Sequence, residues 1–170
     1  MEIAYIGVGS NIGPEENISN ALRLLASSLS VTGISPFYRS KAVGTVDQPD
    51  FVNGVFRIRT GISARKLKFN VLRGIEDRLG RVRNADKNAP RTIDLDLLLY
   101  GELILQAADL TLPDPELTHY PFVGVPLKEL EPTLRVPGTG KLLNEIFPLS
   151  PDAYDLVLLS DFTDGLRIIR

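Results

Sequence analysis

Two amphipathic segments that alternate with short apolar runs constrain the fold more than any other feature of this chain. Apolar residues recur every three or four positions in 18–29 and in 67–79, which predicts a helix in each segment. Apolar runs without that spacing predict strands at 3–8, 31–39, 51–58 and 93–100. The order strand, helix, strand, strand, helix, strand is that of a split βαβ unit. We therefore expect an α+β, ferredoxin-like fold, with helices packed on an antiparallel sheet.

The length of the chain suits one domain. With 170 residues, we expect a main domain over 1–147 and a C-terminal extension over 148–170 that packs on it. Within the main domain, residues 102–147 are rich in proline and should add short strands and helices. Within the extension, 154–159 and 166–169 have the apolar character of two strands, so we expect a β-hairpin there.

Composition and charge exclude several classes of function. The chain has no cysteine, which rules out disulfides and thiolate metal sites. No signal peptide and no stretch of ~20 apolar residues is visible, so we expect a cytoplasmic protein without a membrane partner. The absence of tryptophan and of a basic stripe argues against a nucleic-acid partner. Basic residues prevail in 1–91 and acidic residues in 92–170, and these charges either scatter over solvated faces or meet at one site.

Asp94 and Asp96 are the residues with the clearest chemical meaning. They interrupt an otherwise apolar strand, and residues two apart in a strand point to the same face. We expect Leu95, Leu97 and Leu99 to face the core, and both carboxylates to face outward together. Paired carboxylates repel unless a cation lies between them, and their hard oxygens suit Mg²⁺. The alternative is a solvated strand face with no metal.

Three arginines close to these aspartates in the sequence are candidates for phosphate binding. Arg81, Arg83 and Arg91 precede the aspartates, and arginine binds phosphate oxygens in a bidentate way; ordinary surface arginines are the alternative.

The glycines from Gly7 to Gly13 do not fit a dinucleotide or P-loop motif, because the glycine spacing is wrong and no Gly-Lys-Ser/Thr follows; we expect a tight turn there.

Several segments resemble the 6-hydroxymethyl-7,8-dihydropterin pyrophosphokinases (2-amino-4-hydroxy-6-hydroxymethyldihydropteridine diphosphokinases). The matching segments are AYIGVGSN at 4–11, FYRS at 37–40, DQPDFVN at 47–53, GRVR at 80–83 and, most specifically, PRTIDLDLLLYG at 90–101. The resemblance covers nearly all of 1–147 and implies that this is the pterin pyrophosphokinase domain. It implies transfer of pyrophosphate from ATP to the hydroxymethyl group of the pterin in folate biosynthesis, with release of AMP. We expect a monomer whose partners are these small molecules.

The resemblance also implies roles for individual residues. Two Mg²⁺ ions would bind at Asp94 and Asp96, and the catalytic set would be Arg81, Arg91, Asp94 and Asp96. Phe51 and Phe122 would sandwich the pterin and Asn53 would read its edge; the pterin-binding set is Ser40, Val43, Phe51, Asn53 and Phe122. The ATP-binding set is Glu76, Arg81, Arg83, Arg91, Leu97 and Thr111. Residues 43–50 and 82–90 match mobile loops that close over the substrates.

The sequence departs from the family pattern on the nucleotide side. Asp109 and Tyr120 stand where arginines are expected, Asp114 replaces a histidine, and Asn88 replaces a frequent tryptophan. His119 is either a surface residue or a substitute for that histidine. Two alternatives to the kinase follow: a weakly active or non-catalytic relative that binds pterin or nucleotide through a degenerate ATP pocket, and another two-metal nucleotidyl-transfer enzyme that binds no pterin.

Overall fold

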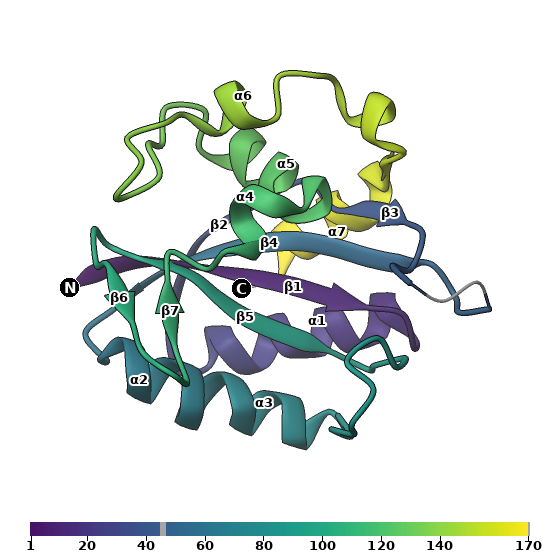
Figure 1. The fold of residues 1–170 in the computed structure, drawn as a ribbon. Coiled ribbons are helices and arrows are strands. Elements are labelled where there is room, and N and C mark those ends of the chain that lie inside the picture. Colours follow the sequence, from purple (N-terminus) through teal and green to yellow (C-terminus); the bar gives the residue numbers. More distant parts are fainter. Residues whose placement is uncertain (45–46, 170) are drawn as a thin grey trace.

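A computed structural model describes residues 1–44 and 47–169, and its centre is an antiparallel sheet (Figure 1). The strands follow the order β5-β1-β4-β3-β8, and β2 pairs with β4 beside β3. Their bounds are β1 Glu2–Ser10, β2 Ser30–Ile34, β3 Tyr38–Ser40, β4 Phe51–Thr60, β5 Asp94–Tyr100 and β8 Val157–Leu158. A separate pair consists of β6 Leu105–Gln106 and β7 Thr111–Leu112. The split βαβ arrangement expected from the sequence is therefore confirmed.

Helices cover both faces of this sheet. The first face carries α1 (Pro14–Ala26) and a continuous helix made of α2 (Ala64–Lys66), the π-helical η1 (Leu67–Leu72) and α3 (Arg73–Arg78). The second face carries α4 (Glu116–His119), α5 (Pro121–Leu130) and α6 (Leu143–Ile146), as Figure 1 shows. Ser63 caps α2 as a helix N-cap, because its hydroxyl accepts a hydrogen bond from the Lys66 amide.

Each face has its own hydrophobic core. Ala4, Ile6 and Leu97 pack against α1 and the α2–α3 helix, whereas Tyr5, Val55 and Leu98 pack against α4, α5 and α6. The expected segregation of β5 side chains holds for Leu95 and Leu97 but is wrong for Leu99. A bulge between Tyr5 and Ile6 shifts the register with β5, so Leu99 joins Leu98 on the second face.

The strand expected at 31–39 is interrupted. The Ser35 hydroxyl accepts a hydrogen bond from the Val55 amide, and the Phe37 ring packs over Gly54. These contacts divide the run into β2 and β3, which pair with different parts of β4.

The hairpin expected in the C-terminal extension is wrong. The extension contains the 3₁₀ helix η2 (Pro151–Tyr154), the two-residue β8, which pairs with β3, and helix α7 (Ser160–Ile168). Phe162, Leu166 and Ile169 recur at helical spacing and pack against the first core. In addition, the Thr163 hydroxyl accepts a hydrogen bond from the Phe37 amide, which anchors α7 to the chain just before β3.

Two further sequence-based expectations concern loops and membranes. The loop expected at 43–50 includes residues 45–46, which lie outside the described residues, so its mobility stays a prediction. Among the described residues, none of the helices has the length and apolar character needed to cross a membrane.

Candidate functional site

The floor of the main pocket is a row of residues across three neighbouring strands. Gly9 of β1 pairs with Asn53 of β4 on one side and with Asp94 of β5 on the other, and Gly7 pairs with Asp96. A Cβ atom at Gly9 would lie 2.6 Å from Asn53 Oδ1. A larger residue here would therefore displace the Asn53 amide, which occupies the space above Gly9. The tight strand-to-helix turn expected here lies at residues 11–13, where Gly13 has a φ of 50°; it begins later than expected, because β1 continues through Gly9 to Ser10.

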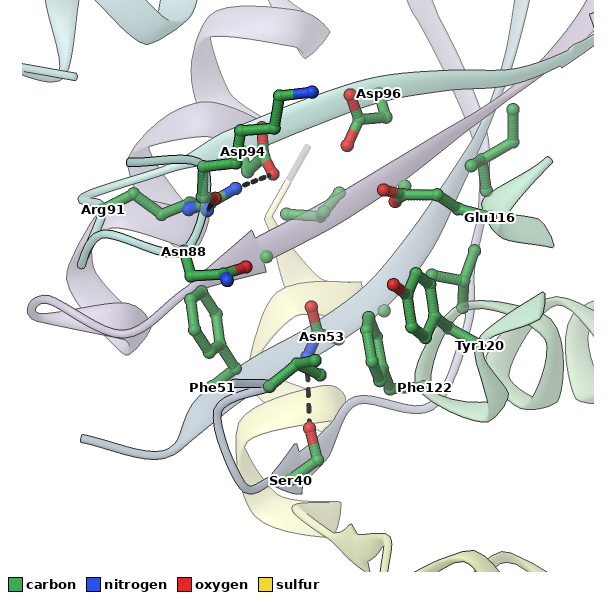
Figure 2. Close-up of a pocket in the computed structure, with 18 of the residues that line it drawn as sticks. Ser40, Phe51, Asn53, Asn88, Arg91, Asp94, Asp96, Glu116, Tyr120 and Phe122 are labelled. Atoms are coloured by element: carbon green, nitrogen blue, oxygen red, sulfur yellow. Dashed lines mark hydrogen bonds and ion pairs between the residues drawn. The ribbon is translucent and has the colours of Figure 1, made fainter. Parts of the chain in front are cut away.

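Two aromatic rings form the walls of this pocket at the Asn53 end. Figure 2 shows Phe51 and Phe122 on opposite sides of Asn53, and all three side chains line the cavity. Asn53 is buried, and its Nδ2 donates a long hydrogen bond of 3.5 Å to Ser40 Oγ. Val43 lines the same end of the pocket. A flat slot between two rings, closed by an amide, fits a flat heterocycle with hydrogen-bonding groups along its edge.

At the other end of the row, the Asp94 carboxylate is held by two arginines. Arg81 Nη1 lies 3.0 Å from Oδ1, and Arg91 Nη1 lies 2.7 Å from Oδ2. Arg81 also donates to the Ile93 carbonyl, and Arg91 N–H donates to Asn11 Oδ1. Both guanidinium groups are largely buried. These contacts fix the two cations beside the carboxylate before any ligand binds.

Asp96 has a different environment. Asp94 and Asp96 share the pocket face, as the alternation in β5 predicted, but Asp96 is partly buried and not fully exposed. Burial, and then the charges of Asp94, Glu116, Asp114 and Glu76, raise the pKa of Asp96 well above its usual range. A nearby cation would therefore stabilise the charged form of this carboxylate.

A second pocket adjoins the first at the carboxylates. It is lined by most residues of the 82–90 loop, Arg83 among them, together with Arg81 and Arg91, and both pockets share Lys87, Arg91, Asp94, Asp96 and Glu116. The 43–50 segment contacts the backbone of this loop, because the Gln48 side chain donates from Nε2 to the Asn88 carbonyl. The Asn11 side chain in turn donates to Gln48 Oε1 and to the Pro49 carbonyl. The site thus has an aromatic half and a basic half that meet at two carboxylates.

Comparisons with known proteins agree on one family. The model of the 7,8-dihydro-6-hydroxymethylpterin-pyrophosphokinases matches residues 5–132. The chain belongs to this family. Its members are ATP-dependent pyrophosphokinases of folate biosynthesis.

Individual relatives carry the same name, 2-amino-4-hydroxy-6-hydroxymethyldihydropteridine pyrophosphokinase. The protein from Haemophilus influenzae is 42% identical over 142 residues, which cover 82% of this chain and 88% of the relative. The protein from Pseudomonas aeruginosa is 40% identical over 156 residues, covering 89% and 93%. The protein from Synechocystis is 40% identical over 146 residues, covering 84% and 73%.

A solved structure supports the fold independently. The crystal structure of Plasmodium falciparum HPPK-DHPS with pteroate aligns with a TM-score of 0.67 at 13% identity. The alignment covers 99% of this chain and 44% of that protein. At this identity the likeness concerns the fold alone.

Three residues of the ATP-binding set expected for a pterin pyrophosphokinase do not line either pocket. Glu76 is buried between α3 and β5, where its carboxylate accepts a hydrogen bond from the Leu95 amide and pairs with Arg83. Burial raises the pKa of Glu76 despite these partners. Leu97 is buried in the first core, and Thr111 is a half-buried residue of β7.

The residues that differ from the family pattern each contact a neighbouring group in the structure. Asp109 forms an ion pair with Arg65 at 2.7 Å, and the hydrogen bond from this guanidinium lowers the pKa of Asp109. Asp114 Oδ1 accepts a hydrogen bond from the Glu116 amide at the start of α4. Tyr120 lines the main pocket, whereas the exposed His119 packs edge-on against its ring and is absent from the residues that line the two described pockets.

Sequence reasoning missed some residues of the site. Gly7 and Gly9 form its floor, and Lys87 and Glu116 line both pockets. The glycines were missed because their role depends on the strand pairing. That a glycine lies between Asp94 and Asn53 can be seen only when the three strands are known to be neighbours. No signal in the sequence marks Glu116, which reaches the site from α4.

Proposed function

We propose that this chain binds 6-hydroxymethyl-7,8-dihydropterin between Phe51 and Phe122 and transfers to it the pyrophosphate group of ATP. The row Asn53, Gly9, Asp94 carries this proposal. At one end of this row, the Asn53 amide can hydrogen-bond to a heterocycle, and at the other end lies the Asp94 carboxylate with its two arginines. The two residues are two strand spacings apart, which is roughly 10 Å. The reactive hydroxymethyl group of a pterin in the slot would then point toward the carboxylates.

The chemistry needs no strong base of the protein. The hydroxymethyl oxygen attacks the β-phosphorus and its proton passes to solvent. The bond from this phosphorus to the oxygen that bridges it to the α-phosphate breaks, and AMP leaves with that oxygen. Phosphoryl transfer of this kind depends on positioning and on neutralisation of the phosphate charges. Arg81, Arg83 and Arg91 supply cations at the second pocket, where a triphosphate would lie.

Asp94 and Asp96 fit Mg²⁺. Both are carboxylates on one strand face, and the raised pKa of Asp96 indicates a site that favours an additional cation. Within 1–44 and 47–169, no group of three or more acidic or histidine side chains is arranged to hold a metal. This suits Mg²⁺, which usually takes one or two carboxylates and completes its shell with water and substrate phosphates. When bound, Mg²⁺ neutralises the developing phosphate charge.

The two arginines on Asp94 would change partners during binding. In the structure, each guanidinium satisfies one oxygen of this carboxylate. With a triphosphate and Mg²⁺ present, phosphate oxygens are competing acceptors for the same guanidinium groups, and the carboxylate oxygens become available as metal ligands. Asp94 therefore keeps Arg81 and Arg91 in place for the nucleotide.

The residues that differ from the family pattern on the nucleotide side leave the arginines free to bind the phosphates of ATP. The charge of Asp109 is compensated by Arg65, and Asp114 acts in the local structure of α4. The cations of the second pocket come from 81–91, which matches the family. Because one chain lines both pockets, we also propose that the enzyme acts as a monomer, and we propose the cytoplasm, where ATP is available, as its location.

Release of AMP tests the proposal. The protein is incubated with ATP, Mg²⁺ and 6-hydroxymethyl-7,8-dihydropterin, and AMP is measured by chromatography, with each component omitted in turn. We expect AMP only when all three are present. Pterin binding by calorimetry without any AMP would favour the non-catalytic relative, and pyrophosphate release without pterin binding would favour a nucleotidyl-transfer enzyme.

A further inference from the structure

We propose that Tyr120 is a positioning residue that holds the Phe122 ring in place as one wall of the pterin slot. This inference rests on the proposed function, because it assigns a role within the same pocket. It concerns the position where the sequence replaces an expected arginine with an aromatic residue.

The contact between the two rings carries the proposal. The ring centroids of Tyr120 and Phe122 lie 4.9 Å apart and their planes differ by 18°, which is a stacked arrangement. Figure 2 shows the order across the pocket: Phe51, then the space in front of Asn53, then Phe122, then Tyr120. Tyr120 therefore lies behind Phe122, on the side away from the slot.

The backbone fixes Tyr120 in this place. Its amide donates to the carbonyl of Glu116, the first residue of α4, and its carbonyl accepts from the Val123 and Gly124 amides at the start of α5, each at 3.0 Å. Pro121 follows and restricts Tyr120 to an extended conformation, in agreement with its φ of −106° and ψ of 123°. The backbone of Tyr120 is thus held between two helices, at a position from which its ring stacks on Phe122.

The opposite wall has a support of a different kind. The guanidinium of Arg91 lies 5.7 Å from the centre of the Phe51 ring, so Phe51 is backed by a cation that also holds Asp94. Among residues 1–44 and 47–169, no cation lies over the Phe122 ring, and the Tyr120 ring takes this place. A fixed ring loses less conformational entropy when the pterin stacks on it, so the support increases affinity.

Calorimetry with four variants tests this role. Dissociation constants for the pterin are measured without nucleotide for Tyr120→Leu, Tyr120→Phe, Phe122→Leu and the double variant Tyr120→Leu/Phe122→Leu. Aromatic pairs of this kind correspond to a factor of about two to ten in affinity. We expect Tyr120→Leu to weaken pterin binding by about this factor, and Tyr120→Phe to keep the affinity because it keeps the ring.

The double variant separates positioning from general damage. If Tyr120 acts through Phe122, the Tyr120→Leu change should have no further effect once Phe122 is leucine. In the AMP assay, Tyr120→Leu should raise KM for the pterin and leave KM for ATP unchanged, and thermal unfolding should show that the variant is folded.

The results that would reject the role of Tyr120 differ from those that would reject the proposed function. Unchanged pterin affinity in Tyr120→Leu, equal losses in Tyr120→Phe and Tyr120→Leu, or independent effects of the two substitutions would each reject the role of the Tyr120 ring. If the unmodified protein binds no pterin and releases no AMP with all three components present, the proposed function fails, and the role of Tyr120 fails with it.

Discussion

Replacement of Asp96 with asparagine should stabilise the free protein while it removes activity. Asp96 lies two positions from Asp94 on one strand face, so their Cα atoms are about 7 Å apart. At effective dielectric constants of roughly 20–80, two like charges at this separation repel by about 0.6 to 2 kcal/mol. Burial adds to this cost, since it is the first cause of the raised pKa of Asp96.

The expected size of the effect follows from this repulsion. For a chain of this size, 1 kcal/mol changes Tm by about 2–4 °C, so we expect Asp96→Asn to raise Tm by about 1–8 °C. The pH dependence has a definite sign. A carboxylate with a raised pKa in the folded state destabilises the fold, and this cost declines as the pH falls from the raised pKa toward the ordinary pKa of an aspartate. The advantage of the asparagine variant should therefore shrink as the pH is lowered into the acid range.

Two assays measure the outcome. Thermal unfolding is followed in EDTA, so that no metal neutralises Asp96, and AMP release is measured with Mg²⁺. Activity should fall about a hundredfold or more, as expected when a group that stabilises transition-state charge is removed. Asp77→Asn is the matched control, because Asp77 is exposed on α3 and such substitutions usually change stability by under ~0.5 kcal/mol.

One result would refute the reasoning. If Asp96→Asn unfolds at a clearly lower temperature than the unmodified protein in EDTA, the carboxylate holds the fold together and is not a strained ligand. Full activity of the variant would separately show that Asp96 is not needed for the transfer.

Three further substitutions have expected outcomes. Gly9→Ala puts a Cβ 2.6 Å from Asn53 Oδ1 and should weaken pterin binding about tenfold or more by calorimetry; unchanged affinity would show that the Asn53 amide is not needed in its observed position. Burial raises the pKa of Tyr5 to about 12, so stability should fall between pH 10 and 12, where the unfolded chain loses the phenol proton first; urea unfolding should show less of this fall in Tyr5→Phe, and equal slopes would argue against it. Arg65→Ala breaks a half-exposed ion pair with Asp109 and should leave the urea unfolding midpoint almost unchanged, so a clear loss of stability would mean that this pair supports the fold.

Much of the fold could be predicted because its signals are local. The helical spacing in 18–29 and 67–79 and the apolar runs of the strands are each contained in one segment. Helix α7 was mistaken for part of a hairpin because a short apolar run fits both periods, and its contact with Phe37 lies far away in the sequence. The position of Leu99 was wrong because a bulge depends on the neighbouring strand.

Some site residues could likewise be predicted from the local sequence, whereas others could not. Asp94, Asp96 and the arginines at 81–91 are close in sequence, so their shared location could be predicted from residue type and spacing. The pocket floor at Gly7 and Gly9 could not, because their meaning comes from the side chains on the strands to either side. The stacking of Tyr120 on Phe122 likewise depends on the junction between two short helices.

The fate of the γ-phosphate tests the central claim most directly. ATP labelled at the γ-phosphorus is incubated with the protein, Mg²⁺ and 6-hydroxymethyl-7,8-dihydropterin, and the products are separated and weighed by mass spectrometry. Pyrophosphoryl transfer predicts that the label moves to a pterin that carries two phosphate groups, and that unlabelled AMP forms in equal amount. Label in free phosphate or pyrophosphate, with the pterin unchanged, would contradict it.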